Sequence, residues 1–312
     1  MTDTTISTTT TATPAAVLHQ VTEGVHAWVQ PPGGWCLSNA GIVQTRDTTV
    51  LVDTAATERR ATDLRRTVEG LGGRPVGMVV NTHSHGDHTF GNWLFSDSAT
   101  VVAQERAAAE IADFGLALQG LWPGVEWGRV EPVVPVVTFR ERMTLPVTGP
   151  RVELLHFGPG HTAGDTVVWL PDQRVLFTGD LVFSGATPFV LMGSVSGSLR
   201  VLERLRALEP LHVVPGHGPV GGPELLDANA DYLRWVRDLA HAGATAGLRP
   251  LELARATDLG PYARLLDSER LVCNLERAYA EEAGAEPGQP LDVQAAFGEM
   301  VDFCGGLPHC SA

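Results

Sequence analysis

Short apolar runs alternate with helical patterns along the first half of the chain. Apolar and β-branched runs bounded by Gly and Asp predict several strands within residues 19–56. Residues 57–71 then carry apolar side chains at spacings of three and four, which predicts a helix. A short strand follows at residues 76–80, and the Ala- and Leu-rich residues 103–119 predict a second helix. Residues 121–150 contain two Trp and several Pro and predict an irregular connection.

The second half repeats this order of strands followed by helices. The apolar runs predict strands at residues 151–157, 166–170, 174–177 and 213–214. The apolar spacing predicts one helix at residues 198–208 and further helices from about 223 to 283. Because strands cluster in both halves with helices between them, we expect an α/β fold in which two sheets carry helices on their outer faces.

Composition narrows the function classes that this fold can serve. The 312 residues are 44% apolar and 19% charged, which indicates a chain that buries a large core. The formal net charge of −14 argues against a protein that tracks nucleic-acid phosphates. All 22 basic residues are Arg, which excludes a catalytic lysine and a Walker-type phosphate loop. The sequence has no apolar run of about 18 residues, so we expect no membrane-spanning helix.

The N-terminal residues and the cysteines indicate where in the cell the protein is expected, and they do not bear on its chemistry. The Thr-rich residues 1 to about 16 lack a basic region followed by an apolar stretch, so we interpret them as a disordered tail and not as a secretory signal. No Cys-x-x-Cys pair occurs, and we expect free thiols and a cytoplasmic protein. The four cysteines are Cys36, Cys273, Cys304 and Cys310.

Histidine and aspartate recur in Gly-rich segments at the ends of the predicted strands, where converging side chains form sites. The set is His83, His85, Asp87, His88, His161, Asp180 and His217. Imidazole and carboxylate ligands suit zinc and similar divalent ions, and no cysteine occurs in these segments. A closed structural zinc site is usually rich in Cys, so the donor types favour a catalytic metal site.

The spacing within the set predicts two neighbouring ions. His83 and His85 lie two residues apart at a strand end, so they project to one side and can share one ion. Asp87 and His88 would then serve a second ion about 4 Å away, and Asp180 is the candidate bridging carboxylate. Any one of these residues alone would more often be a surface or capping residue. We interpret His156 and Asp165 in that way, since nothing in the sequence pairs with them.

The segment His83-Ser84-His85-Gly86-Asp87-His88 resembles the His-x-His-x-Asp-His signature of the metallo-β-lactamase superfamily. The segments around His161, Asp180 and His217 match its later motifs, and the resemblance covers about residues 20–225. It implies an αβ/βα four-layer sandwich with the site between the sheets. It also implies that His83, His85 and His161 hold one ion, that Asp87, His88 and His217 hold the other, and that Asp180 bridges them, as in glyoxalase II and the lactonases. We expect a disordered tail at residues 1–16, the catalytic domain at 17–225 and a helical extension packed on it at 226–312.

Three departures narrow the resemblance. Di-iron members that reduce oxygen carry Glu at the position of His85, and β-lactamases proper usually lack the bridging carboxylate found here as Asp180. Nuclease members contain a large inserted domain and basic patches, and this acidic chain has neither. The resemblance therefore favours a hydrolase with two metal ions, most consistent with zinc.

A second resemblance concerns the substrate. Residues 32–41, 115–123 and 137–142 are similar to bacterial aromatic polyketide cyclases of the actinorhodin second-ring type, which act on chains held by an acyl carrier protein. This implies a metal-dependent cyclase and thioesterase in which Asp87 and Asp180 are catalytic. The expected substrate pocket consists of Trp35, Trp122, Phe183, Phe189 and Met192.

Other functions stay open on the sequence alone. A generic hydrolase of a thioester or lactone would share every metal ligand and differ only in its pocket, and a non-enzymatic metal-binding protein would use the same scaffold. Residues 216–221 fit a dinucleotide-binding pattern, but Pro219 delays the helix that such a site needs. The C-terminal helices would serve as a lid, as a homodimer surface or as both. We expect no nucleic-acid and no membrane partner.

Overall fold

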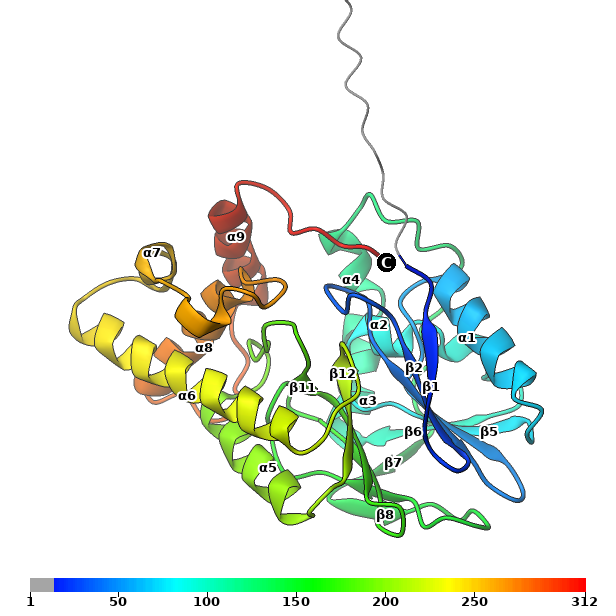
Figure 1. The fold of residues 1–312 in the computed structure, drawn as a ribbon. Helices are drawn as coiled ribbons and strands as arrows, with labels where there is room; N and C mark the ends of the chain where they lie inside the picture. The colour runs from blue at the N-terminus through cyan, green and yellow to red at the C-terminus, as the bar shows by residue number, and fades with distance from the viewer. Residues whose placement is uncertain (1–13) are drawn as a thin grey trace, which may run out of the picture.

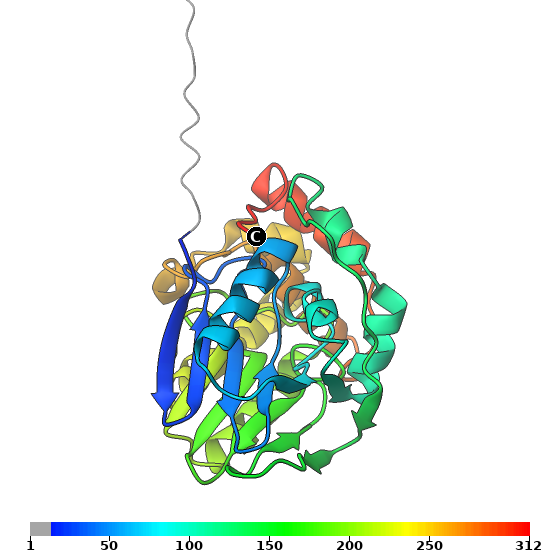
Figure 2. The same cartoon turned by 90° about the vertical axis from the view of Figure 1, so that its right-hand side faces the viewer.

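Two β-sheets pack face to face and carry helices on their outer sides (Figure 1; Figure 2). The computed structural model describes residues 14–312. The predicted disordered tail falls mostly on residues 1–13, which lie outside the described residues. The αβ/βα sandwich expected from the sequence is confirmed.

The first sheet contains, in the described part of the chain, seven strands in sequential order. They are β1 (Val17–Thr22), β2 (Val25–Val29), β3 (Ala40–Gln44), β4 (Thr49–Val52), β5 (Val76–Val80), β6 (Thr100–Gln104) and β7 (Val137–Phe139). Neighbours from β1 to β4 pair antiparallel, and those from β4 to β7 pair parallel. Helices α1 (Glu58–Gly70) and α3 (Glu105–Phe114) provide two of the crossovers. Because parallel strands end at the same edge, the segments that follow β4 and β5 come together there.

The second sheet has the order β12-β11-β10-β9-β8. Its strands are β8 (Arg142–Thr144), β9 (Glu153–Leu155), β10 (Val167–Leu170), β11 (Val175–Phe183) and β12 (His212–His217). Strands β11 and β12 pair parallel through the crossover helix α5 (Val195–Ala207), and the other neighbours pair antiparallel. The carboxyl ends of β11 and β12 therefore lie side by side at one edge.

The remaining helices follow the second sheet or connect strands of the first. They are α2 (Gly86–Thr89), α4 (Ala117–Leu121), α6 (Glu224–Thr245), α7 (Pro250–Ala256), α8 (Arg270–Glu282) and α9 (Val293–Cys304), with 3-10 turns η1 (Asn92–Leu94) and η2 (Gly260–Tyr262). Helix α6 packs against α5 and α8, and α8 packs against α9 (Figure 1). The division at residue 225 stays a prediction, although α6 begins beside it.

The central core lies between the two sheets. Val25 and Ala27 of the first sheet and Leu170 and Phe177 of the second belong to one buried cluster. Phe177 packs so closely over Gly41 that a side chain at this position would overlap its ring. On the outer side, α1 covers the first sheet with its buried apolar face. The close approach of the sheets fixes the position of the strand edges that carry the polar segments.

Two expectations about local structure are corrected, and a third is extended. Residues 103 and 104 belong to strand β6, because the run Thr100–Gln104 passes into α3 with no Gly or Pro to mark the boundary. Residues 121–150, expected to be an irregular connection, contain β7 of the first sheet and β8 of the second. Both strands have only three residues, which is too short for a period of apolar positions to be recognised. The individual helices expected up to about residue 283 are followed by one more, α9, within the extension expected to be helical.

The membrane expectation agrees with the structure over its described residues. Among residues 14–312, no helix combines the length and the apolar character needed to cross a bilayer.

Candidate metal centre and adjoining cavity

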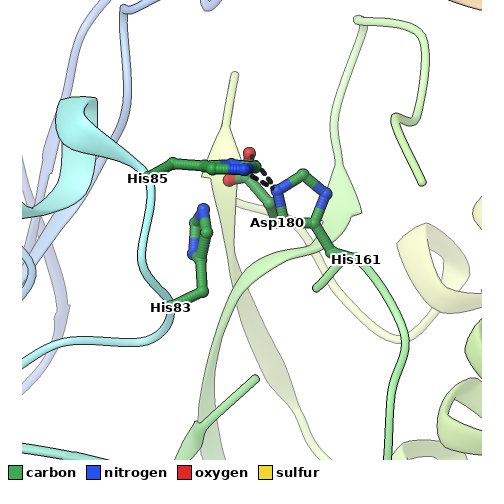
Figure 3. A group of neighbouring side chains, drawn as sticks. All are labelled: His83, His85, His161 and Asp180. Atoms are coloured by element: carbon green, nitrogen blue, oxygen red, sulfur yellow. Dashed lines mark hydrogen bonds and ion pairs between the residues drawn. The ribbon is translucent and has the colours of Figure 1, made fainter. Parts of the chain in front are cut away.

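Three histidines and one aspartate form the first half of a polar cluster between the sheets (Figure 3). The ring centroids of His83, His85 and His161 lie 4.6 to 4.7 Å apart, and the rings are nearly perpendicular to one another. His161 Nε2 lies 2.9 Å from His85 Nδ1. These three side chains and Asp180 each point one ligand atom into a space within 4.8 Å of the others. The group therefore presents its donors toward a common point.

Asp87, His88 and His217 form the second half, again with ligand atoms within 4.8 Å of one another. His217 Nε2 lies 3.3 Å from Asp87 Oδ2, and His88 Nε2 lies 3.8 Å from the same oxygen. Asp87 and His88 belong to the single-turn helix α2, whereas His217 ends β12. Two segments more than 120 residues apart thus meet at the same strand edge.

Asp180 contacts both halves. Its carboxylate lies 3.5 Å from His161 Nε2 in the first half, and 3.1 Å from His88 Nε2 and 3.4 Å from His217 Nε2 in the second. We expected Asp180 in a turn at a strand end, but it lies within the nine-residue strand β11. Gly179, with φ of 51°, interrupts the register beside it, and this irregularity accompanies the inward carboxylate.

Backbone carbonyls fix the orientation of two of the imidazoles. His161 Nδ1 lies 2.5 Å from the carbonyl oxygen of Phe189, and His217 Nδ1 lies 3.2 Å from that of Gly34. A carbonyl oxygen only accepts, so both Nδ1 atoms must donate a proton. Each Nε2 then faces the cluster and is the atom that binds a cation once it carries no proton.

Asp53 fixes two further imidazoles, and sequence analysis missed it. It follows β4 with a φ of 60° and accepts hydrogen bonds from His88 Nδ1 at 2.9 Å and from Thr82 Oγ1 at 2.6 Å. Because the Thr82 hydroxyl donates to Asp53, its oxygen accepts from His83 Nδ1 at 3.0 Å. His83 and His88 therefore also turn Nε2 toward the cluster. The sequence signal that could have identified Asp53 is its position directly after a buried apolar run.

Burial keeps the three histidines of the first half uncharged. Desolvation lowers the pKa of His83 well below its usual value, lowers that of His85 to about 3 and lowers that of His161. At neutral pH these three rings are neutral and ready to act as ligands.

The second half carries charge instead. Burial alone would lower the pKa of His88 and His217, but Asp180 and Asp87 outweigh it, raising the first well above its usual value and the second to about 9. Burial likewise opposes ionisation of Asp87, yet His88 and His217 lower its pKa to about 2. The carboxylates thus draw positive charge into this half of the cluster.

The cluster fits a pair of divalent cations. Two of its buried ring nitrogens, His83 Nε2 and His85 Nε2, have no hydrogen-bond partner in the described structure, and His88 Nε2 and Asp180 Oδ1 meet within the cluster at 3.1 Å. Buried acceptors are rarely left without a partner, so an unpaired inward-facing set calls for a cation. Imidazole and carboxylate donors without thiolate suit zinc and similar ions, although these residues do not identify the metal.

Close backbone approach explains the glycines around the cluster. A side chain at Gly216 would overlap the carboxylate of Asp180, and Gly218 has a φ of 82° that other residues rarely adopt. Glycine is therefore required for β12 to bring His217 against Asp180.

His156 and Asp165, which we interpreted as surface or capping residues and not as ligands, have hydrogen-bond partners that the sequence did not show. The Asp165 carboxylate accepts hydrogen bonds from the backbone N–H groups of Gly160 and Thr162 at about 3 Å. His156 Nδ1 lies 2.7 Å from the carbonyl oxygen of Asp165. Burial raises the pKa of Asp165 to about 7. These residues hold the loop that places His161, and so their role is structural.

A cavity of about 650 Å³ opens over the cluster. We name the seven-residue cluster beneath it the floor; five of its members line the cavity, namely His85, Asp87, His161, Asp180 and His217. We name its ring-bearing side the aromatic wall; it consists of Trp35, Trp122, Phe183, Phe189 and Phe297. The five residues expected to form a pocket all line this cavity, since Met192 does so as well. Their contact with substrate stays a prediction.

Helices α8 and α9 complete the wall, and sequence analysis did not identify this contribution. Phe297 of α9 lies 5.9 Å from the ring of Trp35 and 6.2 Å from that of Trp122. The buried Arg270 of α8 places its guanidinium 4.1 Å from the Trp35 ring, and Glu269 accepts a hydrogen bond from Trp35 Nε1 at 2.7 Å. The C-terminal helices thus position the wall across the cavity.

Comparisons with known proteins agree with this geometry. The solved structure of a metallo-beta-lactamase from Pontibacter korlensis superposes with a TM-score of 0.59 at 25% identity, covering 70% of this chain and 99% of that one. A linear primary-alkylsulfatase from a Pseudomonas species is 26% identical over 68% of this chain and 48% of its own length. The human acyl-coenzyme A thioesterase MBLAC2 is 26% identical over 60% of this chain and 72% of its own.

The chain spans about half the length of the first curated relatives that it matches. The family model described as the metallo-beta-lactamase superfamily matches residues 33–217, which hold all seven residues of the cluster. The chain belongs to the metallo-beta-lactamase superfamily.

Proposed function

We propose that this protein is a hydrolase that uses two divalent cations, most consistent with zinc, to cleave the thioester of a hydrophobic, aromatic acyl chain. An acyl chain that fits this description is a polyketide held as a thioester by an acyl carrier protein. The observation that carries the proposal is a cavity whose floor is the seven-residue cluster and whose side is the aromatic wall. The floor supplies hydrolytic chemistry, and the wall suits a flat apolar acyl group.

Each part of the chain has a defined task in this reaction. His83, His85 and His161 would hold one cation, Asp87, His88 and His217 the other, and Asp180 both. Bound cations of this type lower the pKa of a water molecule and polarise a carbonyl group.

Asp87 is the residue best placed to handle a proton. It lines the cavity, and its lowered pKa keeps it ionised at neutral pH, so its carboxylate accepts a hydrogen bond from an attacking water. The aromatic wall binds the acyl group and excludes bulk water from the floor, which strengthens the electrostatic interactions there. Catalysis would therefore depend on Asp87 for orientation and on the wall for substrate choice.

The thioesterase named among the relatives supports the proposed bond type, because that protein is 26% identical over 60% of this chain. A generic hydrolase of an aliphatic thioester or a lactone would use the same floor. The wall favours the aromatic acyl chain over that alternative, since five rings surround the space above the cations.

Aldol ring closure of a β-polyketone is a second candidate activity. The specific observation in its favour is the packing of the wall, in which Trp35 contacts Trp122 and Phe189 with ring centroids 5.3 Å apart. Such a surface can hold a folded, flat chain while its carbonyl groups face the floor. Product analysis separates the two activities, because cyclisation gives a new ring and hydrolysis gives a free acid.

An assay of the zinc-loaded protein tests the proposal. We expect faster turnover of an aromatic acyl thioester than of an acetyl thioester or a homoserine lactone, and the ring-closed product is sought with a polyketone analogue. His85→Ala should abolish turnover, whereas His241→Ala should not, because His241 is exposed on α6 far along the chain from the floor. Equal activity of the two variants, or preference for the lactone, would contradict the proposal.

A further inference from the structure

The C-terminal segment, defined here as residues 305–312, returns from α9 toward the N-terminal half of the molecule (Figure 1). Trp122 Nε1 donates a hydrogen bond to the carbonyl oxygen of Pro308 at 2.8 Å. Arg60 Nη2 donates another to the carbonyl oxygen of Ser311 at 2.7 Å. The segment is thus tied to α1 and to the wall.

The same segment runs along the rim of the cavity. Leu307 is one of the lining residues. Three residues further on, Cys310 Sγ lies 3.7 Å from the carbonyl oxygen of Trp35, whose ring forms part of the aromatic wall. Cys36, the next residue in the chain, also lines the cavity. A bond at this point would therefore act on the rim itself.

Cys36 and Cys310 form a pair of thiols joined by a side-chain hydrogen bond. Cys36 is buried, and Cys310 is partly exposed. The other two cysteines lie apart from this pair, since Cys273 is buried between α8 and α9 and Cys304 is exposed at the end of α9. One buried and one accessible thiol in contact are the arrangement required for disulfide exchange.

The surroundings give the two thiols different reactivities. The hydrogen bond from Cys36 lowers the pKa of Cys310, and the guanidinium of Arg60 acts in the same direction. The hydrogen bond and burial together raise the pKa of Cys36 well above its usual value. Cys310 is therefore the thiol that reacts first, and Cys36 is the thiol that resolves the product.

We propose that Cys36 and Cys310 form a reversible disulfide by exchange with a low-molecular-weight disulfide, and that this bond fastens the C-terminal segment to the rim of the cavity. The geometry that supports this is the position of Cys310 Sγ, which lies 3.7 Å from the carbonyl oxygen of Trp35 and interacts with the side chain of the adjacent Cys36. The segment that carries Cys310 is tied to Trp122 and Arg60 through backbone carbonyl groups.

The exchange balances as follows for a small disulfide RSSR. The thiolate of Cys310 attacks one sulfur, forms a bond to it and expels RS⁻, which takes up the proton that Cys310 released. Cys36 then attacks the Cys310 sulfur, its proton passes to the departing RS⁻, and the Cys36–Cys310 bond forms. The two protein thiols lose two electrons in total, and RSSR is reduced to two RSH.

The effect on turnover rests on the proposed function. We expect the disulfide to hold Leu307 in place at the rim and so to hinder the entry of a large acyl chain. We expect kcat/KM for an aromatic acyl thioester to fall about tenfold in the oxidised protein, with little change for an acetyl thioester. Reduction with dithiothreitol should restore the lost activity.

The test uses the full zinc-loaded chain treated with glutathione disulfide. We expect titratable thiols under denaturing conditions to fall from the four free cysteines of the structure to two, and peptide mapping to join Cys36 to Cys310. Cys310→Ser should prevent the bond, and Cys36→Ser should leave glutathione attached to Cys310. The matched control Cys304→Ser should still form the Cys36–Cys310 disulfide. A cross-link through Cys304, or an unchanged thiol count, would overturn the proposal.

Peptide mapping does not depend on enzymatic turnover, so the disulfide proposal and the proposed function can be contradicted independently of each other. A cross-linked protein that hydrolyses no thioester leaves the disulfide standing and rejects the proposed function. A cross-linked protein that hydrolyses large and small substrates as fast as the reduced one rejects the fastening of the rim. Circular dichroism of the Ser variants checks their folding, and Cys310→Ser is the decisive variant because Cys310 is less buried than Cys36.

Discussion

The floor and the aromatic wall of the cavity are built in different ways. The floor takes most of its residues from short segments at strand edges of both sheets, and four of its five imidazoles are fixed by a second hydrogen bond to a carbonyl, a hydroxyl or Asp53. The wall takes its rings from a loop after β2, from the region of α4, from the last residue of β11 and the segment after it, and from α9. The floor is therefore part of the rigid sandwich, and the wall depends on elements packed upon it.

This difference separates chemistry from selectivity. A change in the floor should affect every substrate, because all substrates need the same cations. A change in the wall should affect large acyl groups and spare small ones, because only large groups reach the rings. Experiments on both regions can test whether the division holds.

The largest effect is expected for Asp180→Asn, because this carboxylate contacts both halves of the cluster. Loss of its charge should lower kcat/KM by at least about 1,000-fold for acetyl and aromatic thioesters alike. Metal analysis by mass spectrometry should show fewer than two ions per chain. The exposed Asp231→Asn serves as the matched control, and selective loss of one substrate only would break the comparison.

The two halves of the floor should respond differently to pH. Cation binding must displace protons from His88 and His217, whose pKa values are raised, but not from His83, His85 or His161, whose pKa values are lowered. Affinity for the second ion should therefore fall as pH falls, by about 100-fold per unit between pH 7 and 6 for two displaced protons.

Affinity for the first ion should stay nearly constant over the same range. Calorimetric titration in buffers of different ionisation enthalpy measures the protons released by each ion. Equal proton release for both ions would show that the two halves do not differ in charge.

A smaller effect is expected for Asp53→Asn, which keeps the size of the side chain and removes its charge. Because Asp53 orients His88 and, through Thr82, His83, metal affinity should fall about 10- to 100-fold. Equilibrium competition with a chelator measures this loss, and the exposed Asp47→Asn is the control. Unchanged affinity would mean that the floor does not need this support.

The smallest effect is expected in the wall. Phe297→Ala should raise KM for an aromatic acyl thioester about tenfold through lost apolar contact, and should leave the acetyl thioester and the metal content unchanged. Phe303→Ala on the same helix is the control, since Phe303 is outside the cavity lining. A parallel loss for both thioesters would indicate damage to the floor, and thermal unfolding checks the stability of each variant.

The sequence carried enough information to locate the floor. Four of its seven residues are adjacent in one segment, and the other three follow Gly-rich patterns near predicted strands. The two-sheet arrangement was also predictable, because clustered apolar runs alternate with helical spacing. Strand β6 and the three-residue strands β7 and β8 escaped prediction, since they lack boundary residues or are too short to show a period.

What the sequence by itself determined is therefore the donor chemistry of the site and the class of fold. Only the tertiary structure decided that Asp53 supports two imidazoles, that Asp180 lies within a strand, and that Cys310 meets Cys36 across 274 positions of the chain. The physical reason is that local patterns report on which face of an element is buried. Contacts between distant elements depend on how those buried faces pack together, and the periodicity of apolar positions within one element carries no information about that packing.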